Sequence, residues 1–431
     1  MAIAWLKSDP EVWLMALFVV FLPFFPLISP FFLVAGLVFT VGRRVYSRNY
    51  SVSVAWKYLV PPAGIFFIFL IGLSHSENIE NGLFEVQKKL SFLIVPAFFF
   101  LWRKPSVSEM VFLLRAFILA LIASAFFCLV QSLLAAWEFH QGKIAGTILT
   151  VDPASDILFG SSFSYFIHPG YLAMYMNLAF TLLALPFILS RRIKIFSDGL
   201  AIPLLCFIFV VIILTASKIN IIVLFLLLFG FLVSFAIVKR KVVLTIILAI
   251  LVTTSSYLAF NYSRVLQYKM IGVQTAINGN TEGMNANEST QLRIFVWKSA
   301  TKVICESPVW GVGTGDVMNE LSKKYSEGNG IAALDSHLNA HNEYLQEWIA
   351  NGIPGLFILL VALVLPVVWA VRQRKTEIWI FIFVVAANFL VETVLAKQSG
   401  ILFFVFFYCF LLQSSMNAGS KTIAEIGAVN P

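Results

Sequence analysis

Residues 198–241 read DGLAIPLLCFIFVVIILTASKINIIVLFLLLFGFLVSFAIVKRK and decide the fold class. Two apolar runs, 198–216 and 219–238, are separated by a short polar stretch around Lys218 and end at a basic cluster, Lys239-Arg240-Lys241. Each run approaches the roughly 20 residues that a helix needs to cross a bilayer. The pattern predicts two adjacent membrane-spanning helices with a tight connection on one side and a basic loop on the other.

The composition of the whole chain supports a membrane location. Of 431 residues, 60% are hydrophobic and only 12% are charged, against about 25% charged residues in a typical soluble domain. This excludes a soluble enzyme, a disordered regulator and a fibrous protein. The net charge of +8 is attributed to basic cytoplasmic loops rather than to nucleic-acid binding. The four cysteines show no metal or disulfide spacing, and we expect the first apolar run to be retained rather than cleaved.

Further apolar runs extend along the chain. They cover residues 12–28, 30–42, 58–74, 89–102, 109–136, 168–190, 198–216, 219–238, 242–260, 352–371, 377–395 and 399–414. Pro23, Pro26 and Pro30 divide the first two runs, because proline disrupts a helix interior. The predicted fold is an all-α integral membrane protein with about 12 transmembrane helices.

The short connections between these runs alternate in charge. Basic clusters follow every second run, at residues 43–48, 103–104, 191–194, 239–241 and 372–375. The other connections are mixed or acidic, as at Glu77, Glu80 and Glu85. Because cytoplasmic loops collect Lys and Arg, we expect both termini in the cytoplasm and the intervening loops on the outer side.

Two outer connections are long, 137–167 and 261–351, and a long polar segment in a compact bundle is usually functional. The second is predicted to contain helices. One would bury a face and stop at Pro308, with the face formed by Leu292, Phe295, Val296, Ser299 and Val303. Another would begin near His341 and break at residues 351–355 before the next span.

Histidines are concentrated on the outer side in this topology: His75, His140, His168, His337 and His341. His337 and His341 could share a helix face, but Leu338 stands where a zinc site of this spacing carries Glu. We therefore expect metal-independent chemistry with no cofactor. The glycine-rich residues 310–316 are interpreted as a turn rather than a nucleotide loop, since no strand precedes them.

Charged side chains at the outer bilayer edge are the other candidates for function. Lys218 lies in the tight connection between the seventh and eighth runs, and Arg293 lies on the first predicted outer helix. Arg264 and Lys397 are weaker candidates of the same kind. Glu392 is placed near the outer end of the eleventh run, where a carboxylate usually has a partner; Lys397 and Lys218 are the expected ones.

These residues resemble the O-antigen ligase superfamily. His341-Asn342, nine residues and then Gly352-Ile353-Pro354-Gly355 match its H-N-x9-G-x-x-G pattern. Arg293, with Trp297 four residues later and residues 308–313 downstream, is similar to its arginine helix and the turn that follows. The family usually has Arg after the Ser that corresponds to Ser217, whereas this chain has Lys218, which binds phosphate as a point charge.

The resemblance implies a fold similar to membrane-embedded GT-C-type glycosyltransferases. The implied domains are spans one to nine (1–260), a large periplasmic loop (261–351), spans ten to twelve (352–416) and a cytoplasmic tail (417–431). It also implies an inner-membrane enzyme of lipopolysaccharide biosynthesis. The donor would be a glycan on undecaprenyl pyrophosphate, and the acceptor would be lipid A-core oligosaccharide.

The chemistry suggests a role for each candidate. His341 is predicted to be the general base for the attacking hydroxyl, because an imidazole titrates near neutral pH. Fixed cations would stabilise the pyrophosphate leaving group, and Arg293, Lys218 and Arg264 are assigned to it. Supporting roles are predicted for Asn342, Gly352, Gly355 and Glu392.

Other functions remain open at the level of sequence. An O-antigen polymerase would use the same spans and cations with another repeat unit as acceptor, and a protein oligosaccharyltransferase would use a protein side chain. A transporter would need ionisable groups near the middle of the spans, where Arg115 is the conspicuous example. A scaffold protein would not need Arg293 or His341.

Overall fold

The computed structural model describes residues 9–48, 56–141, 157–160, 162–189, 194–262 and 289–417. Within these ranges all regular secondary structure is helical, which confirms the predicted all-α class. The long helices α6 (Val107–His140), α8 (Pro169–Leu189), α10 (Lys218–Lys239) and α16 (Glu343–Arg372) are long and apolar enough to cross a membrane. The chain is therefore a membrane protein.

Shorter or less strongly apolar helices coincide with the remaining predicted runs. They are α1 (Pro10–Phe21), α2 (Ser29–Ser47), α3 (Trp56–Leu73), α5 (Ser91–Leu101), α9 (Asp198–Leu214), α11 (Val242–Tyr262), α17 (Thr376–Phe389) and α18 (Gln398–Asn417). Several are shorter than a bilayer requires for a straight helix. The exact number of membrane-crossing helices and the likeness to GT-C enzymes stay predictions.

Two predicted run boundaries were wrong. The first run was expected to reach residue 28, but α1 ends at Phe21 and turns lead through Pro23 and Pro26 to α2. The eleventh run was expected to reach residue 395, but α17 ends at Phe389. Glu392 is therefore in the turn that follows α17 and not inside a span.

Some helices were not predicted. α4 (Ile79–Lys89) occupies the loop that was expected to be merely acidic; Asn78 caps it by accepting a hydrogen bond from the Asn81 N–H at 3.0 Å. In the outer segment, α14 (Val317–Glu327) and the short α15 (Ile331–Asp335) follow α13 (Ser289–Glu306). α4 and α14 are amphipathic and polar on average, and α15 has only five residues, so a search for long apolar runs does not find them.

The break expected at residues 351–355 is a kink within one helix. α16 continues through it, with a non-helical backbone at Gly352 (φ 62°, ψ −152°). The first turns of α16 belong to the outer segment, and the remainder packs against α3 and α17.

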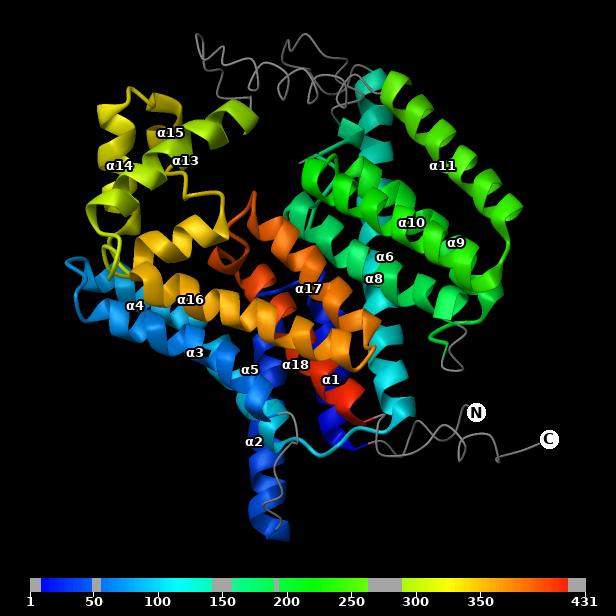
Figure 1. Cartoon of the computed structure of the whole chain (residues 1–431), viewed down its shortest axis with the longest axis horizontal. Coiled ribbons are helices and arrows are strands. Elements are labelled where there is room, and N and C mark those ends of the chain that lie inside the picture. The colour runs from blue at the N-terminus through cyan, green and yellow to red at the C-terminus, as the bar shows by residue number, and fades with distance from the viewer. Residues whose placement is uncertain are drawn as a thin grey trace.

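Helices α13, α14 and α15 gather beside the bundle, around a second hydrophobic core (Figure 1). Val296 and Val303 of α13 lie in this core, as the predicted buried face requires. Leu321 and Tyr325 of α14 pack against them. The larger core lies within the bundle, where α8 packs against α9, α10 and α17, and α18 packs against α5.

The glycine-rich segment 310–316 joins this outer group to the bundle. The Val312 N–H donates to the Ile349 carbonyl at 2.8 Å, and the Gly313 N–H donates to that of Ala350 at 3.0 Å. The carboxylate of Asp316 accepts hydrogen bonds from two backbone N–H groups of residues 77 and 78, at 2.7 and 2.9 Å. The segment is a turn, as predicted, and it attaches to α16 and to the α3–α4 connection.

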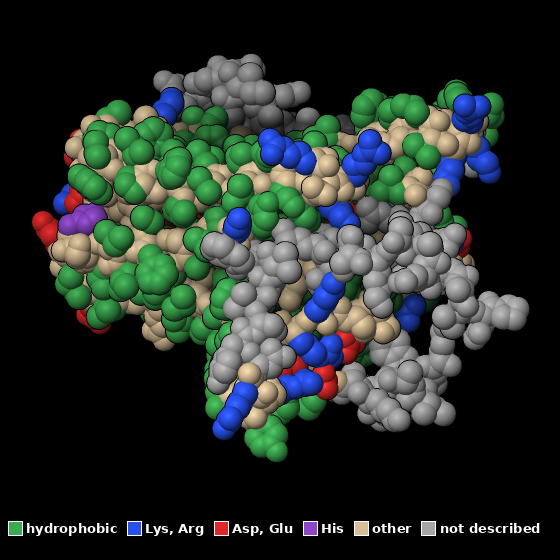
Figure 2. Space-filling model, turned by 60° about the horizontal axis from the view of Figure 1, so that its bottom comes forward, with side chains coloured by type: hydrophobic (Ala, Val, Ile, Leu, Met, Phe, Trp, Pro, Cys, Tyr) green, Lys and Arg blue, Asp and Glu red, His purple; other side chains and the backbone are tan. Residues whose placement is uncertain are grey.

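A charged cluster lies at the ends of α2 and α5. Arg43 is 2.9 Å from Asp9, Arg103 is 2.5 Å from the same carboxylate, and Arg103 also pairs with Glu109 at the start of α6. Figure 2 shows Lys and Arg side chains in small groups between broad hydrophobic areas of the surface. This distribution is typical of a membrane protein, in which the lipid-facing surface is apolar and the charged residues lie at the ends of the helices.

Candidate active site

A carboxylate from the turn after α17 connects two of the predicted site residues. Glu392 accepts a hydrogen bond from the Arg293 guanidinium through Oε1. Its other oxygen, Oε2, lies 3.2 Å from Nδ1 of His341. The expected partners of Glu392, Lys397 and Lys218, were wrong: the fold brings the carboxylate to α13 instead, 99 residues away in sequence.

The third predicted residue contacts the same helix from the start of α10. Lys218 begins α10, and its Nζ donates to Oγ1 of Thr290 at 2.5 Å. Thr290 and Arg293 are three residues apart on α13, so they lie on one face of that helix. Two cations from distant parts of the chain thus meet along one side of α13.

The contact with Glu392 determines which nitrogen of His341 can act as a base. An ionised carboxylate only accepts hydrogen bonds, so Nδ1 of His341 carries the proton that points to Glu392. The lone pair of a neutral imidazole is then on Nε2. The His341 side chain is a quarter exposed, so this nitrogen can meet a substrate.

The backbone around His341 is held in an uncommon conformation. His341 directly precedes the N-cap of α16 and has φ 43°, in the left-handed region. Its carbonyl accepts a hydrogen bond from the Trp297 indole at 3.3 Å, and its N–H donates to the Asn339 side chain at 3.1 Å. α13 therefore fixes both the imidazole, through Arg293 and Glu392, and the main chain, through Trp297.

The environment of Glu392 favours its ionised form. Burial opposes the charge, but the hydrogen bond with His341 and the positive charge of Arg293 outweigh it, so the pKa of Glu392 lies below its usual value of 4.5. Near neutral pH the residue is a carboxylate. It can orient the imidazole and stabilise the imidazolium that forms when Nε2 takes up a proton.

The other predicted supporting residues shape the backbone. Asn342 caps α16 by accepting from the Leu345 N–H at 3.1 Å, and its amide donates to the Leu390 carbonyl at 3.0 Å. A side chain at Gly352 would overlap the Val309 carbonyl, and a Cβ at Gly355 would be 2.6 Å from that of Asn351. These residues hold the start and the kink of α16 rather than face a substrate. Arg264 lies outside the described residues.

A buried charged group below the site was missed by the sequence analysis. Glu343, fully buried, accepts the Leu395 N–H at 2.7 Å, and Lys89 donates to the Leu395 carbonyl. Glu347, one turn later, is also buried and interacts electrostatically with Lys89. Both main-chain groups of Leu395 are thus held, which fixes the turn that carries Glu392. The four-residue spacing of the two glutamates was the available signal.

A second polar group holds the turn that carries Lys218. The Asn220 amide donates to the Gly170 carbonyl at 3.1 Å, to Ser217 Oγ at 3.0 Å and to Asn388 Oδ1 at 2.8 Å. Asn388 is four residues before Glu392 on the chain. α8, α10 and α17 are therefore connected directly beneath the site.

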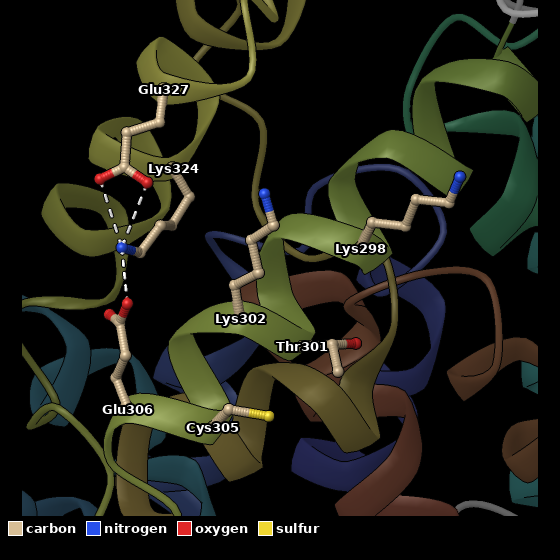
Figure 3. Close-up of a pocket in the computed structure, with 7 residues that line it drawn as sticks. All are labelled: Lys298, Thr301, Lys302, Cys305, Glu306, Lys324 and Glu327. Carbon is tan, nitrogen blue, oxygen red and sulfur yellow. Dashed lines mark hydrogen bonds and ion pairs between the residues drawn. The ribbon is translucent and has the colours of Figure 1, made fainter.

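A separate hollow of about 640 Å³ lies between α13 and α14, on a different face of α13 from Arg293 (Figure 3). Lys298 and Lys302 extend at its edge, whereas Lys324 is bound between Glu306 at 2.7 Å and Glu327 at 3.3 Å. These surface lysines serve below as controls for Arg293.

Comparison with known proteins gives one family match and one distant relative. A family model described as O-antigen ligase matches residues 202–360, which contain Lys218, Arg293 and His341. An uncharacterised protein of Haemophilus influenzae is 23% identical over 141 residues, which is 32% of this chain. The matched part spans only 35% of the length of that relative. His168 and Glu392 lie outside the family match.

The matched region extends from α9 to the first half of α16. Together with the apolar helices and the cations assembled on α13, the match makes residues 202–360 similar to the O-antigen ligase family.

Proposed function

We propose that this chain is an O-antigen ligase. It transfers a glycan from undecaprenyl pyrophosphate to lipid A-core oligosaccharide at the periplasmic face of the bacterial inner membrane. The observation that carries the proposal is the arrangement Arg293–Glu392–His341, with Lys218 joined to the same helix face through Thr290. It offers a base and two cations from separate parts of the chain.

The proposed reaction is a single displacement at the anomeric carbon with inversion. Nε2 of His341 takes the proton of the acceptor hydroxyl as its oxygen forms the new glycosidic bond. The bond between the anomeric carbon and the phosphate oxygen breaks, and its electron pair leaves with the diphosphate. Arg293 and Lys218 stabilise that growing charge, with Arg264 as a third cation. General-base catalysis by His341 should raise the rate of glycan transfer by a factor of about 10²–10⁴.

The orientation follows from charge. We assign the cytoplasmic side to the basic connections that contain Arg43 and Arg103 and to both termini, because cytoplasmic loops collect Lys and Arg. The domain limits 1–260, 261–351, 352–416 and 417–431 are part of the same proposal. The donor, the acceptor and membrane lipids are the proposed partners, and nucleic acid is not one.

An O-antigen polymerase is the second candidate, because the family match covers both types and the same base and cations would serve a repeat-unit acceptor. A protein oligosaccharyltransferase would differ only in its acceptor. A transporter is less favoured, because Arg293, His341, Glu392 and Lys218 gather around α13, although Lys89, Glu343 and Glu347 are buried in the bundle.

The proposed function is tested by complementing a deletion strain and separating its lipopolysaccharide on a gel. The deletion of a ligase gives bare core and accumulated lipid-linked polymer, whereas the deletion of a polymerase gives core with one repeat. His341→Ala is expected to give the full deletion pattern, because no other group replaces Nε2. Arg293→Ala is expected to lower transfer at least about tenfold, since a charged hydrogen bond is worth about 1.5–3 kcal/mol.

Two matched variants control for folding and charge. His337→Asn changes an exposed histidine four residues from His341, and Asn tolerates the left-handed backbone at that position (φ 46°). Lys302→Ala removes an exposed cation from the same helix as Arg293. Both should ligate like the wild type. Normal ligation by His341→Ala in membranes would remove His341 from the mechanism.

A further inference from the structure

A second histidine lies beside the proposed site, in a part of the chain that the mechanism does not use. His168 immediately precedes α8, and its side chain is exposed. Its Nδ1 accepts a hydrogen bond from the Gly170 N–H at 3.2 Å. A backbone N–H can only donate, so Nδ1 carries no proton and the neutral ring carries its proton on Nε2.

The position of His168 is tied to both halves of the site. The carbonyl of Gly170 accepts a hydrogen bond from Asn220, whose amide also contacts Ser217, the residue before Lys218. Asn220 also donates to Asn388, on the helix that leads to Glu392. His168 therefore lies next to the turn of Lys218 and is linked through Asn220 to the helix that precedes Glu392.

The Nε2 nitrogens of the two histidines have opposite hydrogen-bonding roles. His341 offers the lone pair of Nε2, because its Nδ1 faces a carboxylate. His168 offers an N–H at Nε2, because its Nδ1 faces a backbone donor. One ring can take up a proton from a hydroxyl, and the other can donate a hydrogen bond to an anion.

We infer that His168 is a further diphosphate-binding residue, which donates a hydrogen bond from Nε2 to an oxygen of the prenyl diphosphate held by Lys218 and Arg293. The inference rests on the proposed function, because it assigns His168 to the leaving group of that reaction. It adds a neutral donor to the two cations, and it brings α8 into the site although α8 lies outside the family match.

Two substitutions separate this role from a structural one. A glutamine amide reaches about as far as Nε2 of histidine and can donate there, whereas an asparagine amide ends near the position of Nδ1. His168→Gln should therefore recover most of the diphosphate affinity, and His168→Asn should behave like His168→Ala. For His341 the pattern differs, because an amide is no base: His341→Gln should transfer no glycan.

The experiment measures binding of farnesyl diphosphate and farnesyl monophosphate to the full-length protein in lipid nanodiscs. Wild type should bind the diphosphate more tightly. His168→Ala and His168→Asn should lose about tenfold in diphosphate affinity, which corresponds to one hydrogen bond to a charged group. His168→Gln should stay within about threefold of wild type. His75→Ala, which removes another exposed histidine, should bind like wild type.

The possible failures are distinguishable. If Arg293→Ala and Lys218→Ala abolish diphosphate binding while His168→Ala leaves it unchanged, the role of His168 is overturned and the proposed function stands. If His168→Gln and His168→Asn lose affinity equally, the assignment of the proton to Nε2 is wrong. If wild type does not prefer the diphosphate and Arg293→Ala changes nothing, the proposed function itself fails. Equal thermal unfolding midpoints of the three His168 variants exclude misfolding as the cause.

Discussion

At the scale of single residues, Glu392 joins a guanidinium to an imidazole, and its replacement should show a specific pH dependence. Its pKa is lowered in the folded protein, so its ionisation stabilises the fold. This contribution is complete above the unfolded value of 4.5 and is lost as the pH falls through the lower folded pKa. Glu392→Gln should lower stability by roughly 1–3 kcal/mol at pH 7, because Arg293 and His341 lose the negative charge of their acceptor. The difference from wild type should shrink below about pH 4.5.

Thermal unfolding at pH 7 and pH 4 measures this effect. Glu320→Gln is the control, because Glu320 pairs with the largely exposed Lys323 and surface pairs contribute little. A gap between wild type and Glu392→Gln that is the same at both pH values would show that the charge of Glu392 is not what stabilises the site.

At the scale of elements, the kink of α16 depends on one glycine. Gly352 has φ 62°, and a Cβ there would overlap the Val309 carbonyl. The backbone strain alone costs about 1–3 kcal/mol, and the overlap adds to it. Gly352→Ala should therefore lower the unfolding midpoint and abolish ligation, since His341 lies directly before the N-cap of the helix that contains the kink.

The control for this prediction is a glycine inside another helix. A Cβ at Gly230 in α10 meets nothing within 4 Å, and alanine favours a helix interior by up to about 1 kcal/mol over glycine. Gly230→Ala should be neutral or slightly stabilising by the same thermal assay. Equal effects of the two substitutions would mean that the close approach at Gly352 is not required.

At the scale of the whole molecule, the native cysteines report on the proposed orientation. Cys305 is exposed beside the hollow on α13, whereas Cys128 and Cys409 are buried. Cys206 is exposed on the apolar helix α9, where lipid would cover it. A membrane-impermeant maleimide should label the protein in cells with a permeabilised outer membrane, and Cys305→Ser should remove the label. Cys206→Ser should keep it.

Labelling that occurs only after the inner membrane is broken would reverse the orientation. In that case the proposed site would face the cytoplasm, and a periplasmic transfer reaction would be impossible.

Much of this architecture could be predicted from hydropathy and spacing. The apolar runs predicted α8, α10 and α11 almost to the residue, because a helix that crosses a bilayer must be apolar along its length. The helical spacing of the apolar residues Val296 and Val303 predicted α13, and both side chains are buried. Helices α4 and α14 were missed, because their stability comes from packing on neighbours rather than from a continuous apolar run.

The sequence indicated several of the site residues but not the contacts between them. His341 and Arg293 could be selected as candidates from a motif and a charge, but their connection through Glu392 could not, because it depends on how distant helices pack. The search for a partner of Glu392 favoured the nearby Lys397, which is exposed in the fold. The buried pair Lys89 and Glu343 was overlooked because neither residue belongs to a motif.

The turn at residues 310–316 has a consequence for how substrates arrive. It is joined through main-chain hydrogen bonds to α16 and, through Asp316, to the connection between α3 and α4. A segment anchored to two spans cannot swing open like a hinged cover. In the proposed reaction the donor and the acceptor are both anchored by lipid chains, so both would reach this fixed site by lateral diffusion within the bilayer.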